Sequence, residues 1–100
     1  MNTWMNNVMP FQLQRIHDFR SQFSTELTPE QNKHLDKIAN KLEHMDLHGF
    51  DELKSEGDAL FGTEPATKAT REAVPFPRVL AGQNYNHVMT QIRAMVLWFQ

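Results

Sequence analysis

Apolar residues recur at spacings of three and four in four segments of the chain, and no segment shows the alternation that is typical of a β-strand. These segments predict helices over about residues 10–24, 29–48, 51–61 and 84–99, with a loop over about 62–83. We therefore expect an all-α fold with a single domain, residues 1–100. Its first two helices should form an antiparallel hairpin, and a proline-containing loop should lead into the C-terminal helix. The positions expected to face the core are Leu13, Ile16, Phe19 or Arg20, Phe23, Leu35, Ile38, Ala39, Leu42, Met45, Leu53, Leu60, Phe61, Tyr85, Val88, Met89, Ile92, Met95 or Val96, and Phe99.

Short local signals mark the expected helix ends. The run Thr28-Pro29-Glu30-Gln31 combines an N-cap hydroxyl, a proline at the first helical position and a glutamine three residues after the cap, which together predict a capping box. Gly49 is expected to end the same helix in a left-handed conformation, and Asp51 to cap the next one. Gly57 is expected to weaken the middle of that next helix by roughly 1 kcal/mol relative to alanine.

The C-terminal run Met95-Val96-Leu97-Trp98-Phe99 is apolar around the whole circumference of the predicted helix. It is far too short to span a bilayer, which takes about 20 apolar residues. A helix end of this kind is either buried in the core or exposed as a contact surface. The apolar residues around Trp4 are expected to cover the core from the other end of the chain and to meet Trp98 and Phe99.

The segment Val74-Pro75-Phe76-Pro77-Arg78 places two prolines around an aromatic residue. Such a segment is not expected to join a regular helix, and the residue between the prolines favours extended geometry. It is either a rigid connector into the last helix or a preformed recognition strand whose Phe76 enters a pocket of a partner. Because X-Pro bonds in mobile loops populate the cis form and exchange slowly, the Phe76–Pro77 bond is also a candidate target for a host prolyl isomerase.

The composition narrows the functional classes. The formal net charge of −2 argues against a protein whose affinity depends on neutralising many phosphates. The chain has no cysteine, so disulfides, thiolate metal sites and thiol nucleophiles are excluded. The first residues lack the basic start and the apolar run of a signal peptide, so we expect a cytoplasmic protein without a membrane segment.

The stretch from residue 43 to residue 58 is markedly acidic, with six carboxylates against one lysine, Lys54. Its acidic residues are Glu43, Asp46, Asp51, Glu52, Glu56 and Asp58. Charged runs of this kind are usually solvated surface. The alternative is a patch that complements a basic groove on a partner, where charge guides association.

No group of residues has the spacing of a catalytic centre. His44 and His48 lie four residues apart on the predicted second helix, but two ligands alone seldom hold zinc, so we expect no metal and no cofactor. Histidines near a helix C-terminus also interact favourably with the helix dipole. Ser21, Ser24 and Ser55 do not lie in a nucleophile elbow, and the chain has no glycine-rich phosphate loop, so we expect no enzymatic activity.

The opening Met1-Asn2-Thr3-Trp4-Met5-Asn6-Asn7-Val8-Met9-Pro10-Phe11, together with the size, the missing cysteines and the helical layout, resembles the small anti-RecBCD proteins of lambdoid phages. The resemblance implies a phage-encoded protein without enzymatic activity of its own that acts in the bacterial host cytoplasm. Such a protein would bind the host RecBCD helicase–nuclease and change its activity. It would thereby protect phage DNA ends and favour phage recombination.

Contact with a protein partner is therefore the expected function, without sequence-specific binding to nucleic acid. The candidate partner-binding residues are Pro75, Phe76, Pro77, Arg78, Trp98 and Phe99. One alternative is a structural phage or plasmid protein that self-associates through its apolar last helix. The other is a small DNA-binding regulator with a helix-turn-helix around Gly49 or Gly82, although its last predicted helix has only Arg93 as a cation.

Overall fold

The computed structural model describes residues 3–62 and 76–99 of the chain. A short π-helix, η1 (Trp4–Val8), continues directly into α1 (Met9–Gln22). Three further helices follow, namely α2 (Pro29–Glu43), α3 (Phe50–Phe61) and α5 (Phe76–Phe99). No residue in these ranges lies in a strand, so the predicted all-α fold is confirmed.

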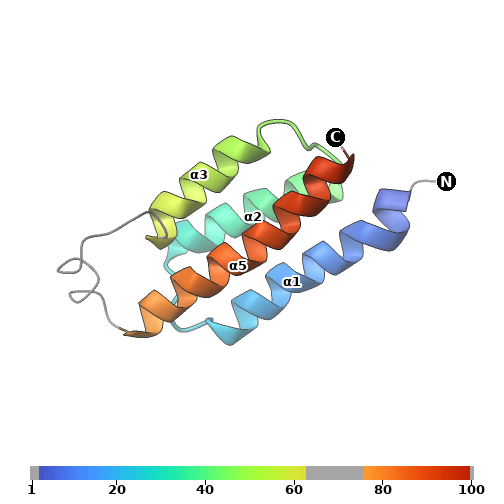
Figure 1. Cartoon of the computed structure of the whole chain (residues 1–100). Coiled ribbons are helices and arrows are strands. Elements are labelled where there is room, and N and C mark those ends of the chain that lie inside the picture. Colours follow the sequence, from blue (N-terminus) through green and yellow to red (C-terminus); the bar gives the residue numbers. More distant parts are fainter. Residues whose placement is uncertain (1–2, 63–75, 100) are drawn as a thin grey trace.

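The four α-helices alternate in direction and enclose one core (Figure 1). Each helix packs on the next one in the chain, and α5 returns to contact α1, so the contacts close a ring in the order α1, α2, α3, α5. The predicted antiparallel packing of the first two helices is part of this ring. Both described ends of the chain and the α2–α3 connection lie at one end of the bundle (Figure 1). None of the helices in the described ranges has the length and apolar character needed to cross a bilayer.

The start of α2 forms as its local sequence predicts. The Gln31 amide donates to the Thr28 hydroxyl at 3.1 Å, and the Thr28 amide donates to the Gln31 side chain at 2.9 Å. This capping box satisfies two amides that have no acceptor within the helix. Pro29 occupies the first helical position, where its missing N–H costs nothing.

The end of α2 was wrongly predicted, because the helix stops at Glu43 rather than near residue 48. Met45 adopts a left-handed conformation with φ of 52°. The Asp46 amide then donates to the Lys41 carbonyl at 2.9 Å, and the Met45 amide donates to the Leu42 carbonyl at 3.3 Å. This pattern is a Schellman motif, in which Met45 stands where glycine is most common.

Gly49 does adopt a left-handed conformation, with φ of 69°, but it precedes α3 rather than ending α2. Its carbonyl accepts the Leu53 amide at 3.2 Å. The prediction that Asp51 caps α3 is therefore wrong, because the helix already begins at Phe50, whose ring is buried.

The predicted loop over residues 62–83 is wrong from residue 76 onward, because α5 begins at Phe76 and not near residue 84. Pro77 lies in the first turn of α5, where a helix has no acceptor for its amides and a proline is tolerated. The two prolines therefore do not keep the whole segment out of a helix. The predicted loop between residues 63 and 75 lies outside the described residues.

The predicted helical faces are largely the buried ones. The core contains Trp4, Ile16, Phe19, Phe23, Leu35, Ile38, Leu42, Leu47, Phe50, Leu53, Phe61, Ala81, Tyr85, Met89, Ile92 and Val96. Leu13, Ala39, Leu60, Val88 and Phe99 pack partly buried against it. One expected core residue, Met45, is exposed, because it follows the end of α2. Of the two alternatives Met95 and Val96, the structure buries Val96 and leaves Met95 exposed. Arg20 is also outside the core and pairs with Asp36 at 2.7 Å, which joins α1 to α2.

Candidate partner-binding surface

The C-terminal end of α5 divides its apolar residues between the core and the surface. Tyr85, Met89, Ile92 and Val96 follow one another at helical spacing and are all buried. Trp98 comes two residues after Val96, which is about 200° further around the helix, so its indole points away from the core. It is 81% exposed.

Phe99, by contrast, belongs to the edge of the core. Its ring meets that of Trp4 edge-on, with centroids 5.3 Å apart. Trp4 is completely buried, and its indole N–H donates to the Leu42 carbonyl at 3.0 Å. The expected meeting of the two chain ends is therefore confirmed for Phe99, while Trp98 stays outside the core.

A second exposed aromatic ring, that of Phe11, lies on α1, which packs against α5. The Arg15 guanidinium donates to the Gln91 side chain, which places these two residues at the same level of the antiparallel α1–α5 pair. Phe11 precedes Arg15 by one turn and Met95 follows Gln91 by one turn, so both steps lead toward the end of the bundle where the chain termini lie (Figure 1).

Phe11 is 65% exposed and Met95 is 36% exposed. Together with Trp98 they form an exposed apolar surface across α1 and α5, which we call the terminal apolar face. Three more exposed hydrophobic residues, Met5, Met45 and Leu97, belong to segments that reach the same end of the bundle, namely η1, the α2–α3 connection and the last turn of α5 (Figure 1).

Two other candidate residues, Pro77 and Arg78, lie at the opposite end of α5. Pro77 and Arg78 are exposed in its first turn, 20 residues before Trp98, which corresponds to about 30 Å along the helix axis. Pro75 and the side chain of Phe76 lie outside the described part of the structure. The structure therefore does not bring the two groups of candidate residues together.

Arg78 also lines an open pocket of about 290 Å³ between the start of α2 and the end of α3. The other lining residues are Thr28, Gln31, Ala59, Leu60, Phe61 and Gly62. Among the lining residues that the structure describes, Arg78 is the single charged one, and these residues hold no arrangement of acid, base and nucleophile.

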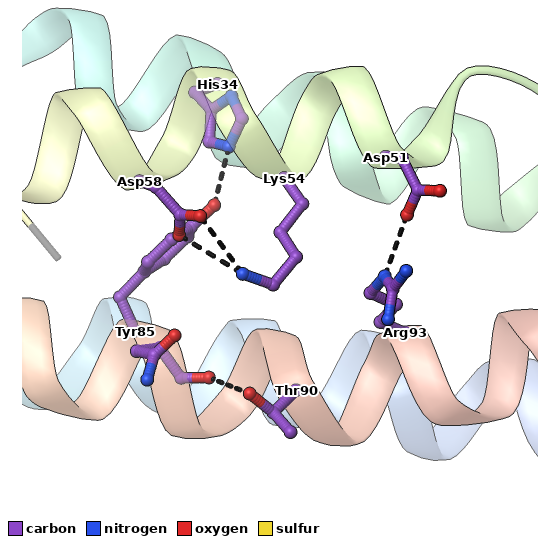
Figure 2. Close-up of polar contacts among 8 residues, drawn as sticks. His34, Asp51, Lys54, Asp58, Tyr85, Thr90 and Arg93 are labelled. Atoms are coloured by element: carbon purple, nitrogen blue, oxygen red, sulfur yellow. Dashed lines mark hydrogen bonds and ion pairs between the residues drawn. The ribbon is translucent and has the colours of Figure 1, made fainter. Parts of the chain in front are cut away.

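A polar cluster that the sequence analysis missed lies inside the bundle (Figure 2). His34 of α2 is 1% exposed, and its Nε2 lies 2.9 Å from the hydroxyl of Tyr85 on α5. Its Nδ1 lies 3.4 Å from the Glu56 carboxylate, which also accepts from Lys37 at 3.2 Å. This geometry suits a neutral imidazole whose Nε2 accepts the Tyr85 hydroxyl proton and whose protonated Nδ1 lies beside the Glu56 carboxylate without the geometry of a hydrogen bond.

Burial determines how this cluster titrates. Loss of solvent lowers the pKa of His34 below its ordinary value, against the opposing influence of the Glu56 carboxylate. Burial likewise raises the pKa of Tyr85, so this phenol stays protonated. The hydrogen bond from Lys37 lowers the pKa of Glu56. His34 therefore resists protonation although a carboxylate lies beside it.

The absence of a side chain at Gly57 allows α3 to pack closely against His34 and Tyr85. A Cβ at position 57 would lie 1.6 Å from the Tyr85 hydroxyl and 2.5 Å from Nε2 of His34. Tyr85 has no room to retreat, because its ring stacks on that of Phe61 with centroids 4.0 Å apart. The glycine that looked unfavourable for helix formation is thus required for close packing.

Most of the acidic residues between positions 43 and 58 are neutralised by cations from neighbouring elements. The ion pairs are Lys41–Asp46, Arg93–Asp51, Lys37–Glu56 and Lys54–Asp58, and the second and fourth appear in Figure 2. Arg93 donates to Asp51 at 2.7 Å, which raises the pKa of the guanidinium. The pairing favours an ordinary solvated surface over a patch directed at a basic partner.

The two histidines at the end of α2 do not lie on adjacent turns of a helix, because α2 ends before them. The ring nitrogen Nδ1 of His44 forms a 2.8 Å hydrogen bond with the Asn40 carbonyl. His48 follows in the α2–α3 connection. Within residues 3–62 and 76–99, no three histidine or carboxylate side chains gather at one point as metal ligands would.

The chain matches no family model, no curated protein and no solved structure.

Proposed function

We propose that this protein is a phage-encoded modulator that binds the host RecBCD helicase–nuclease and changes its activity, protecting phage DNA ends and favouring phage recombination. The observation that carries the proposal is the exposure of Trp98 beside a core that is complete without it. The proposed partner follows from the resemblance of the N-terminal segment to the small anti-RecBCD proteins.

Burial of the water-exposed Trp98 indole by a partner would favour binding. A tryptophan side chain contributes roughly 200 Å² of surface to an interface, and burial of apolar surface is worth about 25 cal/mol per Å². For a residue that is 81% exposed, a partner that covers it gains about 4 kcal/mol before the costs of association. Aromatic residues of this kind are frequent among the few residues that dominate a protein interface.

The charge distribution supports a protein partner rather than direct coating of DNA ends. The formal net charge is −2, and several cations of the described helices are already paired with carboxylates of the same chain. A protein that coats DNA needs many cations available for phosphates.

The direct test is a nuclease assay with purified RecBCD and linear duplex DNA, in which this protein is added at increasing concentration. We expect degradation of the DNA to change in a saturable way, and the protein alone to leave the DNA intact. A Trp98→Ala variant should require a higher concentration for the same effect. Unchanged RecBCD activity at saturating protein, together with no detectable complex, would refute the proposal.

A host prolyl isomerase is proposed as a second partner, acting at the Phe76–Pro77 bond where α5 begins. The test compares Pro77→Ala with Pro29→Ala, because both prolines lie in the first turn of a helix. We expect only Pro77→Ala to reduce isomerase binding and to alter refolding kinetics. Equal behaviour of the two variants would exclude a specific role of this bond.

A further inference from the structure

The two layers of the bundle differ in charge. In η1, α1 and α5 (residues 4–22 and 76–99) four arginines accompany a single carboxylate, Asp18, which gives a formal net charge of +3. Residues 29–61, which contain α2 and α3, have eight carboxylates against four lysines, a formal net charge of −4. Since α1 and α5 are neighbours in the ring, their outer sides form one surface. The terminal apolar face therefore lies on the basic layer.

Arg15 is the cation that lies nearest to this face along α1, one turn from Phe11. Two other arginines, Arg20 and Arg93, each pair with a carboxylate at 2.7 Å. Arg15 instead donates to the amide oxygen of Gln91, which has no charge to offset that of the guanidinium. The apolar face is thus bordered by a guanidinium whose hydrogen-bond partner, the Gln91 side chain, is neutral.

We propose that the terminal apolar face and Arg15 together dock an acidic amphipathic segment of the partner protein. The proposal rests on the proposed function and specifies the chemistry of the surface that is recognised. Apolar side chains of the segment cover Phe11, Met95 and Trp98, and a carboxylate next to them pairs with Arg15. Guanidinium and carboxylate form paired hydrogen bonds with defined geometry, so this contact also sets the orientation of the segment.

Charge complementarity selects this occupant over two others. A second copy docked through the same face would bring the Arg15 side chains of both copies into one interface, and the terminal apolar face itself has no carboxylate to pair with them, which opposes association. A DNA backbone would require a row of available cations, whereas Arg20 and Arg93 on this layer are already engaged with carboxylates. An acidic amphipathic segment covers the apolar residues and also supplies a carboxylate for Arg15.

The test measures the affinity of the tagged full-length protein for purified RecBCD at low and moderate salt. The informative variants are Trp98→Ala and Arg15→Glu, both at positions outside the core, with Arg15→Gln as an intermediate. Leu80→Ala is the apolar control, because Leu80 lies on the same outer side of α5 about 27 Å away. Lys33→Glu is the charge control on the acidic layer.

We expect Trp98→Ala and Arg15→Glu each to weaken binding about tenfold or more, because both would remove central contacts. Arg15→Gln should weaken binding less and should reduce its salt dependence. The two controls should stay within about twofold of the wild type, and thermal unfolding followed by circular dichroism should show that every variant is folded.

Three results would overturn the inference. If the wild type binds RecBCD and both Trp98→Ala and Arg15→Glu bind equally well, the docking surface is elsewhere and the proposed function stands. If the wild type does not bind, the proposed function fails and the inference fails with it. If sedimentation shows a dimer that Trp98→Ala dissociates, the occupant of the face is a second copy.

Discussion

Gly57→Ala should destabilise the protein, although helix propensity alone predicts the opposite. Alanine favours a helix interior by about 1 kcal/mol over glycine. Against this gain, the new methyl group would overlap the Tyr85 hydroxyl and Nε2 of His34, at 1.6 and 2.5 Å. Both side chains are buried, so the overlap cannot be relieved into solvent.

The expected magnitude follows from two costs. Overpacking of a close-packed core costs about 1–3 kcal/mol, and separation of a buried hydrogen-bonded pair costs about 1–3 kcal/mol. After subtraction of the helix-propensity gain, the free energy of unfolding should fall by about 3 kcal/mol, within a range of roughly 1–5 kcal/mol.

The assay is urea unfolding followed by circular dichroism at neutral pH. The matched control compares Ser55→Ala with Ser55→Gly at an exposed position of the same helix, where alanine should be more stable by about 1 kcal/mol. In a Tyr85→Phe background, which lacks the overlapping hydroxyl, Gly57→Ala should cost at least about 1 kcal/mol less than in the wild type. A Gly57→Ala protein as stable as the wild type would refute the close packing of α3 on this cluster.

Three further predictions concern residues around the core. Burial lowers the pKa of His34 below 6.5, so the unfolded state binds this proton first as the pH falls. The free energy of unfolding should therefore decrease from about pH 6.5 down to the lowered pKa. His34→Gln should reduce this pH dependence in urea titrations at a series of pH values. Thr28→Ala removes the acceptor of the Gln31 amide and should lower the unfolding free energy by about 1 kcal/mol in the same assay, whereas no change would mean that the capping box contributes nothing. Trp4→Phe keeps an aromatic ring beside Phe99 but removes the donor to the Leu42 carbonyl, and should cost about 1 kcal/mol; an unchanged midpoint of thermal unfolding would contradict this.

The local signals in the sequence predicted those features that depend on neighbouring residues only. The helical periods located the four α-helices, although not the end of α2 or the start of α5, and identified most of the residues that face the core. The capping box at Thr28 was correct because both of its hydrogen bonds join residues three apart. The end of α2 was not predictable in the same way, since Met45 adopts a left-handed conformation that the sequence pattern favours for Gly49.

The candidate site could be predicted only in part, because helical period gives the direction of a side chain relative to its helix and not what lies there. Trp98 and Phe99 are neighbours in the sequence and equally apolar, yet Phe99 packs on Trp4 while Trp98 is exposed. Phe99 is covered because η1 places Trp4 against that side of α5. The level of Phe11 relative to Met95 likewise depends on how α5 aligns with α1, which the Arg15–Gln91 hydrogen bond reveals.

By itself, the sequence determined the helical content, the positions of most apolar faces and the absence of cysteine chemistry, because these depend on composition and on spacings of a few residues. The tertiary structure alone decided which apolar residues of the last helix remain exposed. It also explains the glycine at position 57, because His34 and Tyr85, which are 51 positions apart in the sequence, both approach this position closely. The physical reason is that burial and close approach depend on where several helices lie relative to one another, which no single segment of the chain specifies.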